Sequence, residues 1–288
     1  MGERSGAAWT IARRLRRSPL VYRAARRAYT SVNHRRRPVR LPGIPGPVHR
    51  NDLMVDRSSA TSRAAYVATG RQVVDLLAEA LAAVGRPLGE ADVLDFGCGH
   101  GRVIRHLAPV ARSVAACDLD AECVRFCASA FAATPVVGHL DLSAVALAHY
   151  DAIWLGSVIT HHPPEATAEL LTALAGHVRP GGVLVASSGD RSTLDGDLDS
   201  SGREWMAPHV DRLRRELAEV GATYVAYPQV TDGTYGLGYQ SSDWLDTAVA
   251  AVGLVPVWHR SADWGVQATN AWRRPPTRTG GRSTSEMT

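Results

Sequence analysis

The chain has 288 residues, of which 45% are hydrophobic and 21% charged, and its formal net charge is +4 at pH 7. This length fits one large α/β domain with flanking extensions. No apolar run reaches the roughly 18 residues that a membrane-spanning helix needs, and the N-terminal arginines are not followed by the apolar segment of a secretory signal. We therefore expect a cytoplasmic protein, with peripheral contact to a membrane left open.

The positive charge is concentrated in residues 1–50, which contain 13 arginines and one acidic residue, Glu3. Within residues 8–32, apolar side chains recur with a period of 3.6 residues, and Pro19 divides this pattern into two short amphipathic helices. Residues 1–50 are thus predicted to be a basic arm, partly helical or disordered. Its arginines could contact an anionic membrane surface or a nucleic acid. A mobile arm with neither partner is the favoured alternative.

Residues 51–90 are predicted to be a helical segment that packs on the core, with one long helix at about 63–84. From residue 91 onward, strands and helices alternate. Such alternation predicts an α/β fold of the Rossmann-like, doubly wound type, with a mostly parallel sheet between two layers of helices. The expected strands are 92–96, 113–118, 135–138, 151–156 and 183–188, and the expected helices are 101–108, 121–132 and 165–177.

The pattern changes after residue 188, and we expect an insertion at about 189–240. It should contain a polar loop up to residue 203, a helix at 208–220, a strand at 223–227 and a flexible segment rich in glycine and tyrosine at 233–240. The domain should then close with a helix at 241–252, N-capped by Ser241 or Ser242, and with strands at 254–260 and 265–272. Residues 274–288 are predicted to be disordered.

The four cysteines of the chain are Cys98, Cys117, Cys123 and Cys127. None of them forms a CxxC pair, and no nearby histidine or acid completes a tetrahedral metal site. We therefore expect buried, reduced thiols and no metal.

The segment VLDFGCGHGR (residues 93–102) carries the clearest chemical signal. A buried strand leads into Gly97, Gly99 and Gly101, and a helix follows. Glycines let the backbone turn tightly and let a ligand approach the main chain, and a helix N-terminus offers unpaired N–H groups. Asp95 stands two residues before the first glycine, where a carboxylate suits a cationic amino-acid ligand and would repel a pyrophosphate. This acid argues against a nicotinamide cofactor.

Asp118 ends the next expected strand, 17 residues after Gly101. A carboxylate at this position can accept hydrogen bonds from both hydroxyls of a ribose. Asp120, two residues later, is better explained as the N-cap of the following helix. The two expected strand ends thus predict a site for a nucleoside attached to a cationic amino acid.

Four segments, VLDFGCGHGR, ACDLD, YDAIWLGSVITHH and VRPGGVLVASS, resemble successive motifs of class I S-adenosylmethionine (SAM)-dependent methyltransferases. They occur in the family's order within residues 93–188. The resemblance implies a SAM-binding methyltransferase domain over residues 91–273 whose last strand is antiparallel. It also implies a set of cofactor-binding residues: Asp95, Gly97, Cys98, Gly99 and Gly101 at the methionine part, Asp118 at the ribose, Leu119 at the adenine, and Gly156 and Ser157 beside the cofactor.

The sequence departs from this family at the adenine. Many relatives carry a Gly-Asp pair after the third strand, with the acid facing the adenine amino group. Here His139 follows Gly138, with Leu140 and Asp141 after it. His139 and Leu140 are therefore the expected contacts at this place, and a replacement of the missing acid by Asp141 is left open.

The acceptor side of the site should follow the fourth strand, since ligands bind beyond the carboxyl ends of parallel strands. His161 and His162 are the candidate catalytic bases, with His161 preferred because it is nearer the strand end. A structural role for both is an equal alternative. Asp190, Tyr235, Tyr239 and Gln267 are candidate substrate-binding residues. The segment after the fourth strand contains a tryptophan, Trp154, then Gly156-Ser157 and Thr160-His161. It resembles the same segment in a bacterial subgroup of this family whose genes lie near glycosyltransferase genes.

The expected reaction is direct displacement at the SAM methyl carbon, with a small molecule or a glycan as acceptor and a hydroxyl as the favoured acceptor group. A hydroxyl would benefit from a histidine base. A nucleic-acid methyltransferase that uses the arginine-rich arm is an alternative, although Gly-Ser-Val-Ile stands where amino-group methylases carry Asn-Pro-Pro-Tyr. A non-catalytic SAM-binding protein is another. The oligomeric state is not predicted.

Overall fold

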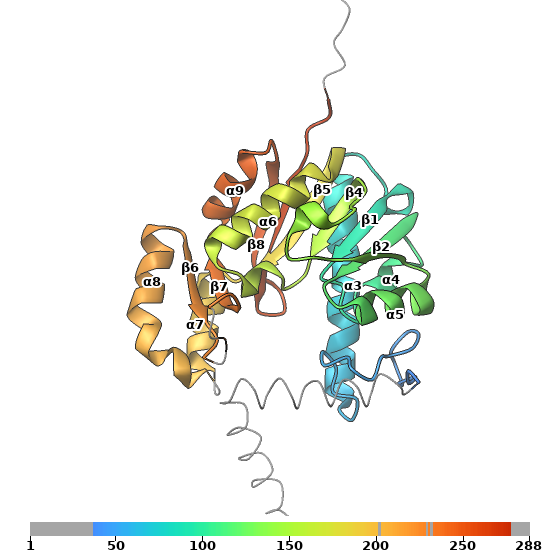
Figure 1. Cartoon of the computed structure of the whole chain (residues 1–288), viewed down its shortest axis with the longest axis horizontal. Helices are drawn as coiled ribbons and strands as arrows, with labels where there is room; N and C mark the ends of the chain where they lie inside the picture. The colour runs from blue at the N-terminus through green and yellow to red at the C-terminus, as the bar shows by residue number, and fades with distance from the viewer. Residues whose placement is uncertain (1–36, 201–202, 229, 231–232, 278–288) are drawn as a thin grey trace, which may run out of the picture.

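The computed structural model describes residues 37–200, 203–228, 230 and 233–277 (Figure 1). These residues form a seven-stranded sheet in the order β3-β2-β1-β4-β5-β9-β8. β1 to β5 are parallel, and β9 runs antiparallel to both β5 and β8. The prediction of a mostly parallel, doubly wound sheet with an antiparallel last strand is confirmed. The strands are β1 (Asp92–Phe96), β2 (Ser113–Asp118), β3 (Thr134–Val137), β4 (Tyr150–Leu155), β5 (Val178–Ser188), β8 (Val255–Trp264) and β9 (Gln267–Arg273).

Helices cover both faces of the sheet because the central strands are apolar on both faces. Val93 packs in a core with α3, α4 and α5, and its neighbour Leu94 packs in a second core with α6 and α9. The same alternation continues along β4 and β5. The cysteines are buried and unpaired, as predicted. The helices are α3 (Ala60–Ala82), α4 (Ile104–Leu107), α5 (Ala121–Phe131), α6 (Pro164–Gly176) and α9 (Ser242–Ala250), the last N-capped by Ser241.

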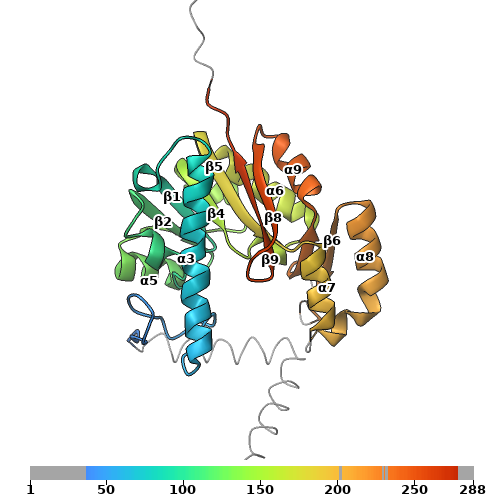
Figure 2. The same cartoon turned by 180° about the vertical axis from the view of Figure 1, so that it is seen from behind.

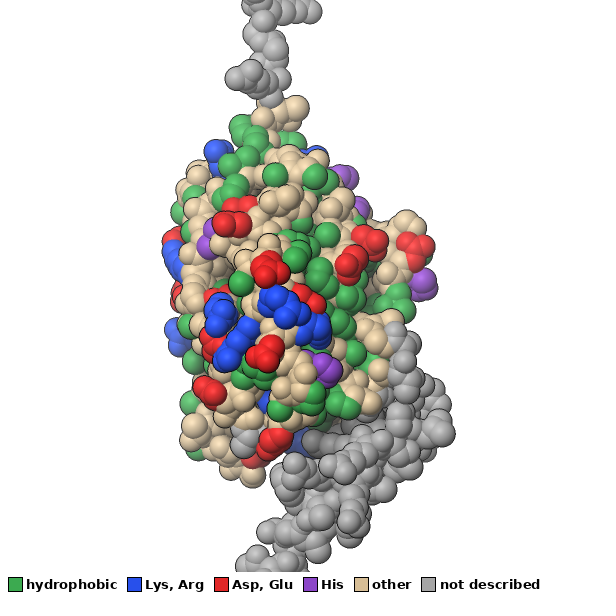
Figure 3. All heavy atoms as spheres, turned by 90° about the vertical axis from the view of Figure 1, so that its left-hand side faces the viewer, with side chains coloured by type: hydrophobic (Ala, Val, Ile, Leu, Met, Phe, Trp, Pro, Cys, Tyr) green, Lys and Arg blue, Asp and Glu red, His purple; other side chains and the backbone are tan. Residues whose placement is uncertain are grey.

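The described residues between 189 and 240 form a lobe with its own small core, which contains Leu194, Met206 and Leu213. Its elements are α7 (Arg191–Asp199), α8 (Val210–Glu219) and the two-stranded sheet of β6 (Ala222–Ala226) and β7 (Gly236–Gln240). Arginine and acidic side chains lie beside one another on the face that Figure 3 shows. The ion pairs of the lobe include Arg191–Asp195, Arg214–Asp195 and Arg212–Glu216.

Two sequence predictions for this lobe are wrong. The expected polar loop contains α7, because the Asp190 carboxylate accepts a hydrogen bond from the Thr193 N–H and Leu194 is buried against the lobe core. The expected flexible segment contains β7, which is buried along its whole length and pairs with β6. In both cases packing overrides a composition that is typical of loops.

Residues 39–55 form what we call the N-terminal strap. Val39 pairs with Val48, and Ile44, Val48 and Val55 pack with Tyr66 of α3. The strap lies beside α5 and the start of α3, whereas the lobe lies on the opposite flank of the sheet in both views (Figures 1 and 2). Both border the edge at which the parallel strands end. The predicted helices within residues 8–32, the rest of residues 1–36 and the tail from residue 278 lie outside the described residues.

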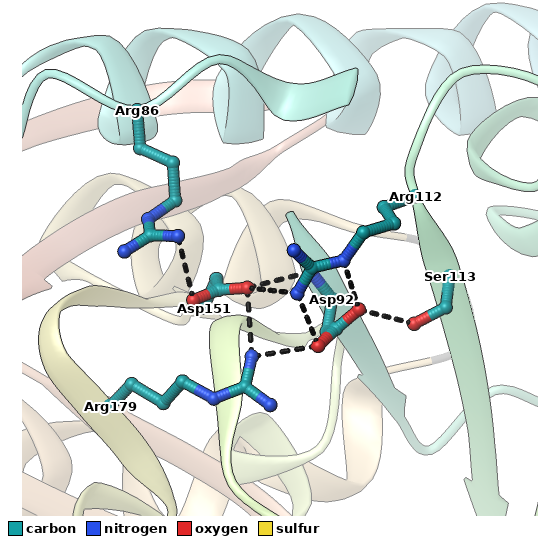
Figure 4. A network of polar contacts seen from close by, with 6 residues as sticks. All are labelled: Arg86, Asp92, Arg112, Ser113, Asp151 and Arg179. Carbon is teal, nitrogen blue, oxygen red and sulfur yellow. Dashed lines mark hydrogen bonds and ion pairs between the residues drawn. The ribbon is translucent and has the colours of Figure 1, made fainter. Parts of the chain in front are cut away.

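A network of charged side chains around Asp151 lies at the edge of the sheet where the parallel strands begin (Figure 4). The Asp151 side chain is 1% exposed. One carboxylate oxygen lies 3.2 Å from Arg86, and the other lies 2.8 Å from Arg179 and 3.3 Å from Arg112. The Asp92 N–H also donates to it. This network joins the starts of four strands at the edge away from the glycine turn. None of the described helices has the length and apolar character that crossing a bilayer requires.

Candidate functional site

The glycine turn (residues 97–101) connects β1 to α4. The N–H groups of Gly97 and Cys98 both donate to the Cys117 carbonyl, at 2.8 and 3.0 Å, which draws the turn against the end of β2. Gly97, Gly99 and Gly101 all have positive φ, which favours glycine. A Cβ at Gly97 would lie 2.6 Å from Val158, whereas a Cβ at Gly99 would meet no atom within 4 Å. The turn is therefore closely packed at Gly97 and open at Gly99, where a ligand can approach the main chain.

Asp95 and Asp118 lie at the same edge of the sheet, as predicted, because β1 and β2 are adjacent and Asp95 is in register with Ala116. The Asp118 carboxylate accepts hydrogen bonds from the N–H groups of Gly99 and Asp120, both at 2.9 Å. It is only partly buried, so part of the carboxylate faces solvent beside the turn. This position suits a carboxylate that accepts hydrogen bonds from ligand hydroxyls.

Asp95 is 2% exposed, and its Oδ2 atom has no hydrogen-bond partner among the described residues. Burial raises the pKa of this carboxyl to about 7, and the nearby Asp118 contributes to the rise while Arg102 opposes it. A buried carboxylate oxygen without a partner is costly, and a ligand cation would remove that cost. Asp95 can therefore accept a cationic group, and the open backbone at Gly99 leaves space for a ligand beside it.

The predicted adenine contacts are exposed at the ends of β2 and β3. Leu119 is 60% and Leu140 is 87% exposed. His139 is also exposed, and its Nδ1 atom accepts a hydrogen bond from the Asp141 N–H at 3.0 Å. The Asp141 carboxylate accepts from the N–H and hydroxyl of Ser143. It is thus engaged locally, as the N-cap of the short helix Leu142–Ala144.

Ser157 adopts a left-handed conformation, with φ +57°, directly after Gly156 at the end of β4. Its N–H donates to the Ser187 hydroxyl at 2.8 Å, and its own hydroxyl accepts from Gln267 Nε2 at 2.9 Å. These bonds tie together the ends of β4, β5 and β9. Non-glycine residues with positive φ cluster at functional sites, where the surrounding structure maintains the strained backbone conformation.

His161 lies in the short helix Ile159–His161 that follows β4. Its Nδ1 atom lies 2.9 Å from the Gly236 carbonyl oxygen, and its ring stacks on Tyr235 with centroids 4.9 Å apart. A carbonyl can only accept, so Nδ1 carries the proton and Nε2 is the acceptor nitrogen of the neutral ring. Burial lowers the pKa of His161. The pKa of His162 is also lowered by burial, and its Nδ1 atom is buried without a partner among the described residues.

The four predicted substrate-binding residues lie in different surroundings. Tyr235 is 47% exposed and belongs to an aromatic cluster with His161, Tyr227 and Trp205. Tyr239 is buried in the lobe, and its hydroxyl donates to Asp197 at 2.8 Å.

Asp190 and Gln267 have polar partners within the chain. Besides capping α7, the Asp190 carboxylate accepts from Ser192 and Ser261. The side chain of Gln267 is hydrogen-bonded to Ser157. The structure thus brings Tyr235 together with His161 and places the other three in contacts that organise the lobe and the strand ends.

Sequence reasoning missed the strap. His49 stacks on His100 of the glycine turn with centroids 4.4 Å apart and lies 3.1 Å from Glu122 of α5. Arg105 is 3% exposed and donates to the carbonyls of Gly101 in the turn and of Pro45 in the strap. The prediction of a basic arm that is partly helical or disordered is wrong for residues 39–50, because apolar residues of this segment pack against Tyr66 and His49 packs beside the turn.

Comparison with known proteins agrees with this geometry. The methyltransferase domain family matches residues 93–182. A protein of Mycobacterium bovis described as an uncharacterized methyltransferase is 39% identical over 101 residues, which cover 34% of this chain and 50% of that protein. Two Mycobacterium tuberculosis proteins of the same description match equally. The chain thus spans about half the length of these relatives.

Two solved structures of methyltransferases are similar to this chain in their backbone arrangement. Magnesium protoporphyrin IX methyltransferase from Synechocystis PCC 6803 with bound SAH has a TM-score of 0.49 at 17% identity, covering 75% of this chain and 88% of that chain. The N-methyltransferase NodS from Bradyrhizobium japonicum, also with S-adenosyl-L-homocysteine, has a TM-score of 0.45 at 14% identity, covering 75% and 89%. Residues 93–182, which contain the glycine turn and the end of β2, thus match a methyltransferase domain in sequence.

Proposed function

We propose that this protein transfers the methyl group of SAM to a hydroxyl of a small molecule or glycan. The observation that carries the proposal is the buried, unpartnered Asp95 carboxylate beside the open Gly99 backbone, with Asp118 at the next strand end. This combination suits a ligand that joins an ammonium group to a ribose. The match of residues 93–182 to the methyltransferase domain family supports the same cofactor.

Bound SAM would supply an electrophilic methyl group on a sulfonium. Asp95 would bind the ammonium, Asp118 would accept hydrogen bonds from the ribose hydroxyls, and Leu119, His139 and Leu140 would border the adenine. Since the sulfonium is already activated, the protein has to align the acceptor behind the methyl carbon and exclude water.

The environment of His161 supports a hydroxyl acceptor. The hydrogen bond to the Gly236 carbonyl leaves Nε2 unprotonated, and burial keeps the ring neutral at pH 7. Such a nitrogen can take the proton of a hydroxyl while the methyl group is transferred. The aromatic cluster of His161, Tyr227, Tyr235 and Trp205 adds a surface on which a flat or ring-shaped acceptor can stack.

Partners and location follow from this proposal. We propose a cytoplasmic enzyme whose acceptor diffuses to the strand-end edge, between strap and lobe. Contact with an anionic membrane through residues 8–32 remains a proposal about a segment outside the described residues. Formation of methylated product from labelled SAM with ring hydroxyl compounds would distinguish an enzyme from a protein that only binds SAM.

Titration calorimetry with SAM tests the cofactor assignment. We expect the wild-type protein to bind SAM and the substitution Asp118→Ala to raise the Kd by about ten- to a hundredfold, because charge-assisted hydrogen bonds to the ribose are lost. Asp120→Ala is the matched control. It removes an acid two residues away whose carboxylate caps α5, so stability should fall but the Kd should stay within about threefold of wild type. Absence of SAM binding by the wild-type protein would refute the proposed function.

The affinity for SAM should depend on pH through Asp95. Its pKa in the ligand-free protein is raised to about 7 by burial, and a bound ammonium favours the charged carboxylate. The affinity should therefore be highest above pH 7 and should fall below it, by about tenfold per pH unit at the steepest. Calorimetry between pH 5.5 and 8.5 measures this slope. A Kd that is constant over the range, or an Asp95→Asn variant that keeps the slope, would exclude Asp95 as the titrating group.

A further inference from the structure

The aromatic cluster of His161, Tyr227, Tyr235 and Trp205 lies where the lobe meets the segment after β4. The His161 and Tyr235 rings are nearly parallel, with centroids 4.9 Å apart and an interplanar angle of 28°. The Tyr227 ring lies 5.5 Å from that of Tyr235 and 5.8 Å from that of Trp205. Tyr235 is exposed, and the other three residues are only partly buried. The cluster thus offers a surface of connected rings to a ligand.

Backbone hydrogen bonds hold this surface in place. Tyr227 follows β6 and Tyr235 precedes β7, and the Tyr227 N–H donates to the Tyr235 carbonyl at 3.1 Å, which continues the pairing of the two strands. The Gly236 carbonyl, one residue further, accepts from His161 Nδ1. The rings are therefore arranged before a ligand binds, so that binding costs little conformational entropy.

The aromatic cluster is close to the glycine turn. A Cβ at Gly97 would lie 2.6 Å from Val158, so Val158 packs directly against the turn. His161 comes three residues later, in the short helix Ile159–His161. Three residues span at most about 11 Å. An acceptor that stacks on the cluster can therefore bring its reacting group to a cofactor bound at the turn.

Polar side chains near the aromatic cluster are already engaged. The carboxylates of Asp190 and Asp197 and the amide of Gln267 all have hydrogen-bond partners within the chain. A sugar carries several hydroxyls, and each that loses water without finding a partner weakens binding. A flat aromatic ring gains its affinity from contact area instead. The described surroundings of the cluster thus favour an aromatic acceptor over a sugar.

The basicity of His161 favours an acidic hydroxyl. Burial lowers the pKa of His161, and the charge of Arg203 adds to this effect. A phenol has a pKa of about 10, as in tyrosine, whereas an aliphatic hydroxyl resembles water, at about 15.7. The equilibrium for proton transfer to His161 is therefore about 10⁵- to 10⁶-fold more favourable for a phenol. A weak base is matched to such a donor.

We propose that the acceptor is a phenol whose flat ring stacks on the aromatic cluster and whose hydroxyl points to Nε2 of His161. This assignment rests on the proposed function and narrows its acceptor class. The phenol O–H bond breaks, the proton goes to Nε2, and an oxygen electron pair forms the bond to the SAM methyl carbon. The bond from methyl to sulfur breaks with its electrons left on sulfur, which gives an aryl methyl ether and S-adenosylhomocysteine. His161 then releases the proton to solvent.

Acceptors that share one ring framework test the assignment. 2-Naphthol has two flat rings, and decahydro-2-naphthol carries its hydroxyl on the same framework in saturated form. With methyl-labelled SAM, we expect a methyl ether from 2-naphthol, with kcat/KM at least about a hundredfold above that for decahydro-2-naphthol. 4-Nitrophenyl glucoside, which has an aromatic ring but only aliphatic hydroxyls, should also be a poor acceptor. Catechol and 4-hydroxybenzoate extend the set of phenols.

Variants of Tyr235 test the stacking. Tyr235→Leu should raise the KM for 2-naphthol by about three- to tenfold, as for other lost aromatic contacts, and change kcat by less than about twofold. Tyr235→Phe keeps the ring and should keep the wild-type KM. Trp258→Leu is the matched control, because it removes an aromatic ring that packs on the α3 face of the sheet. Its KM should equal that of wild type.

The outcomes separate this assignment from the proposed function. Methylation of none of the phenols, or methylation of decahydro-2-naphthol or the glucoside as fast as 2-naphthol, overturns the phenol assignment. An unchanged KM for 2-naphthol in Tyr235→Leu overturns the stacking. In these cases the proposed function stands as long as the wild-type protein binds SAM and methylates an aliphatic hydroxyl. Failure of the wild-type protein to bind SAM refutes the proposed function itself.

Discussion

Replacing His161 with glutamine is expected to lower the rate of methyl transfer to a hydroxyl acceptor by about 10²- to 10⁴-fold, the usual contribution of a general base. The Gly236 carbonyl holds the proton on Nδ1, so Nε2 is the nitrogen that accepts the acceptor's proton. Glutamine keeps a polar side chain of similar length but is not a base at neutral pH. The rate at saturating SAM and acceptor measures the effect, and the Kd for SAM should be unchanged.

His162 provides the matched comparison, because it is adjacent in sequence and its pKa is likewise lowered by burial. His162→Gln should reduce the rate by less than about tenfold. In the wild-type protein, the rate at saturating SAM should fall only below pH 6.5, the ordinary value for histidine, since the His161 pKa lies lower. Equal losses in both variants, or an unchanged rate in His161→Gln, would remove His161 from the catalytic role.

Replacing Asp151 with alanine is expected to destabilise the fold by about 3–5 kcal/mol, as for other buried ion pairs that lose one partner. The change leaves the Arg86, Arg112 and Arg179 guanidinium groups without their shared carboxylate (Figure 4). It also leaves the Asp92 N–H without its acceptor. Urea unfolding with an unchanged m-value measures the loss. SAM binding by the folded variant should be normal, because the network lies at the other edge of the sheet.

Asp195→Ala is the control for this prediction. Asp195 also contacts two arginines, Arg191 and Arg214, but its side chain is 39% exposed on the lobe. Its loss should cost less than about 1 kcal/mol, as for other surface ion pairs. If both substitutions lowered the free energy of unfolding by the same amount, burial would not explain the stabilising effect of the Asp151 network.

The Asp151 network should also make the fold sensitive to acid. The hydrogen bond from Arg112 holds the pKa of Asp92 well below its usual range. A depressed pKa contributes stability above the unfolded value of 3.8, and this contribution is lost as the pH falls toward the folded value.

The central part of the fold could be predicted from local patterns. β1 and β2 begin and end where the sequence predicted, because each is a short apolar run that leads into glycine or into a helix-capping aspartate. Asp95, Asp118 and the three glycines could be recognised for the same reason. Each of them lies within a few residues of the end of its strand, and parallel strands bring their carboxyl ends to one edge.

The lobe could not be predicted in this way. β7 contains Gly236 and Gly238, which usually disfavour strands. A Cβ at Gly236 would lie 2.1 Å from the Val225 carbonyl oxygen, and one at Gly238 would lie 2.5 Å from that of His162. These glycines are required by backbones that approach from elsewhere in the chain. A pattern of neighbouring residues contains no information about such an approach.

By itself, the sequence determined where the central strands lie along the chain, the glycine turn and the two acids beside it, because these depend on residues that are close in the chain. Only the tertiary structure decided which side chains from distant parts of the chain come into contact. It placed Trp264 under Arg102, the Gly236 carbonyl against His161 and the strap beside the glycine turn. These contacts join segments that lie far apart in the sequence, and they form only because the packed sheet and helices bring those segments together.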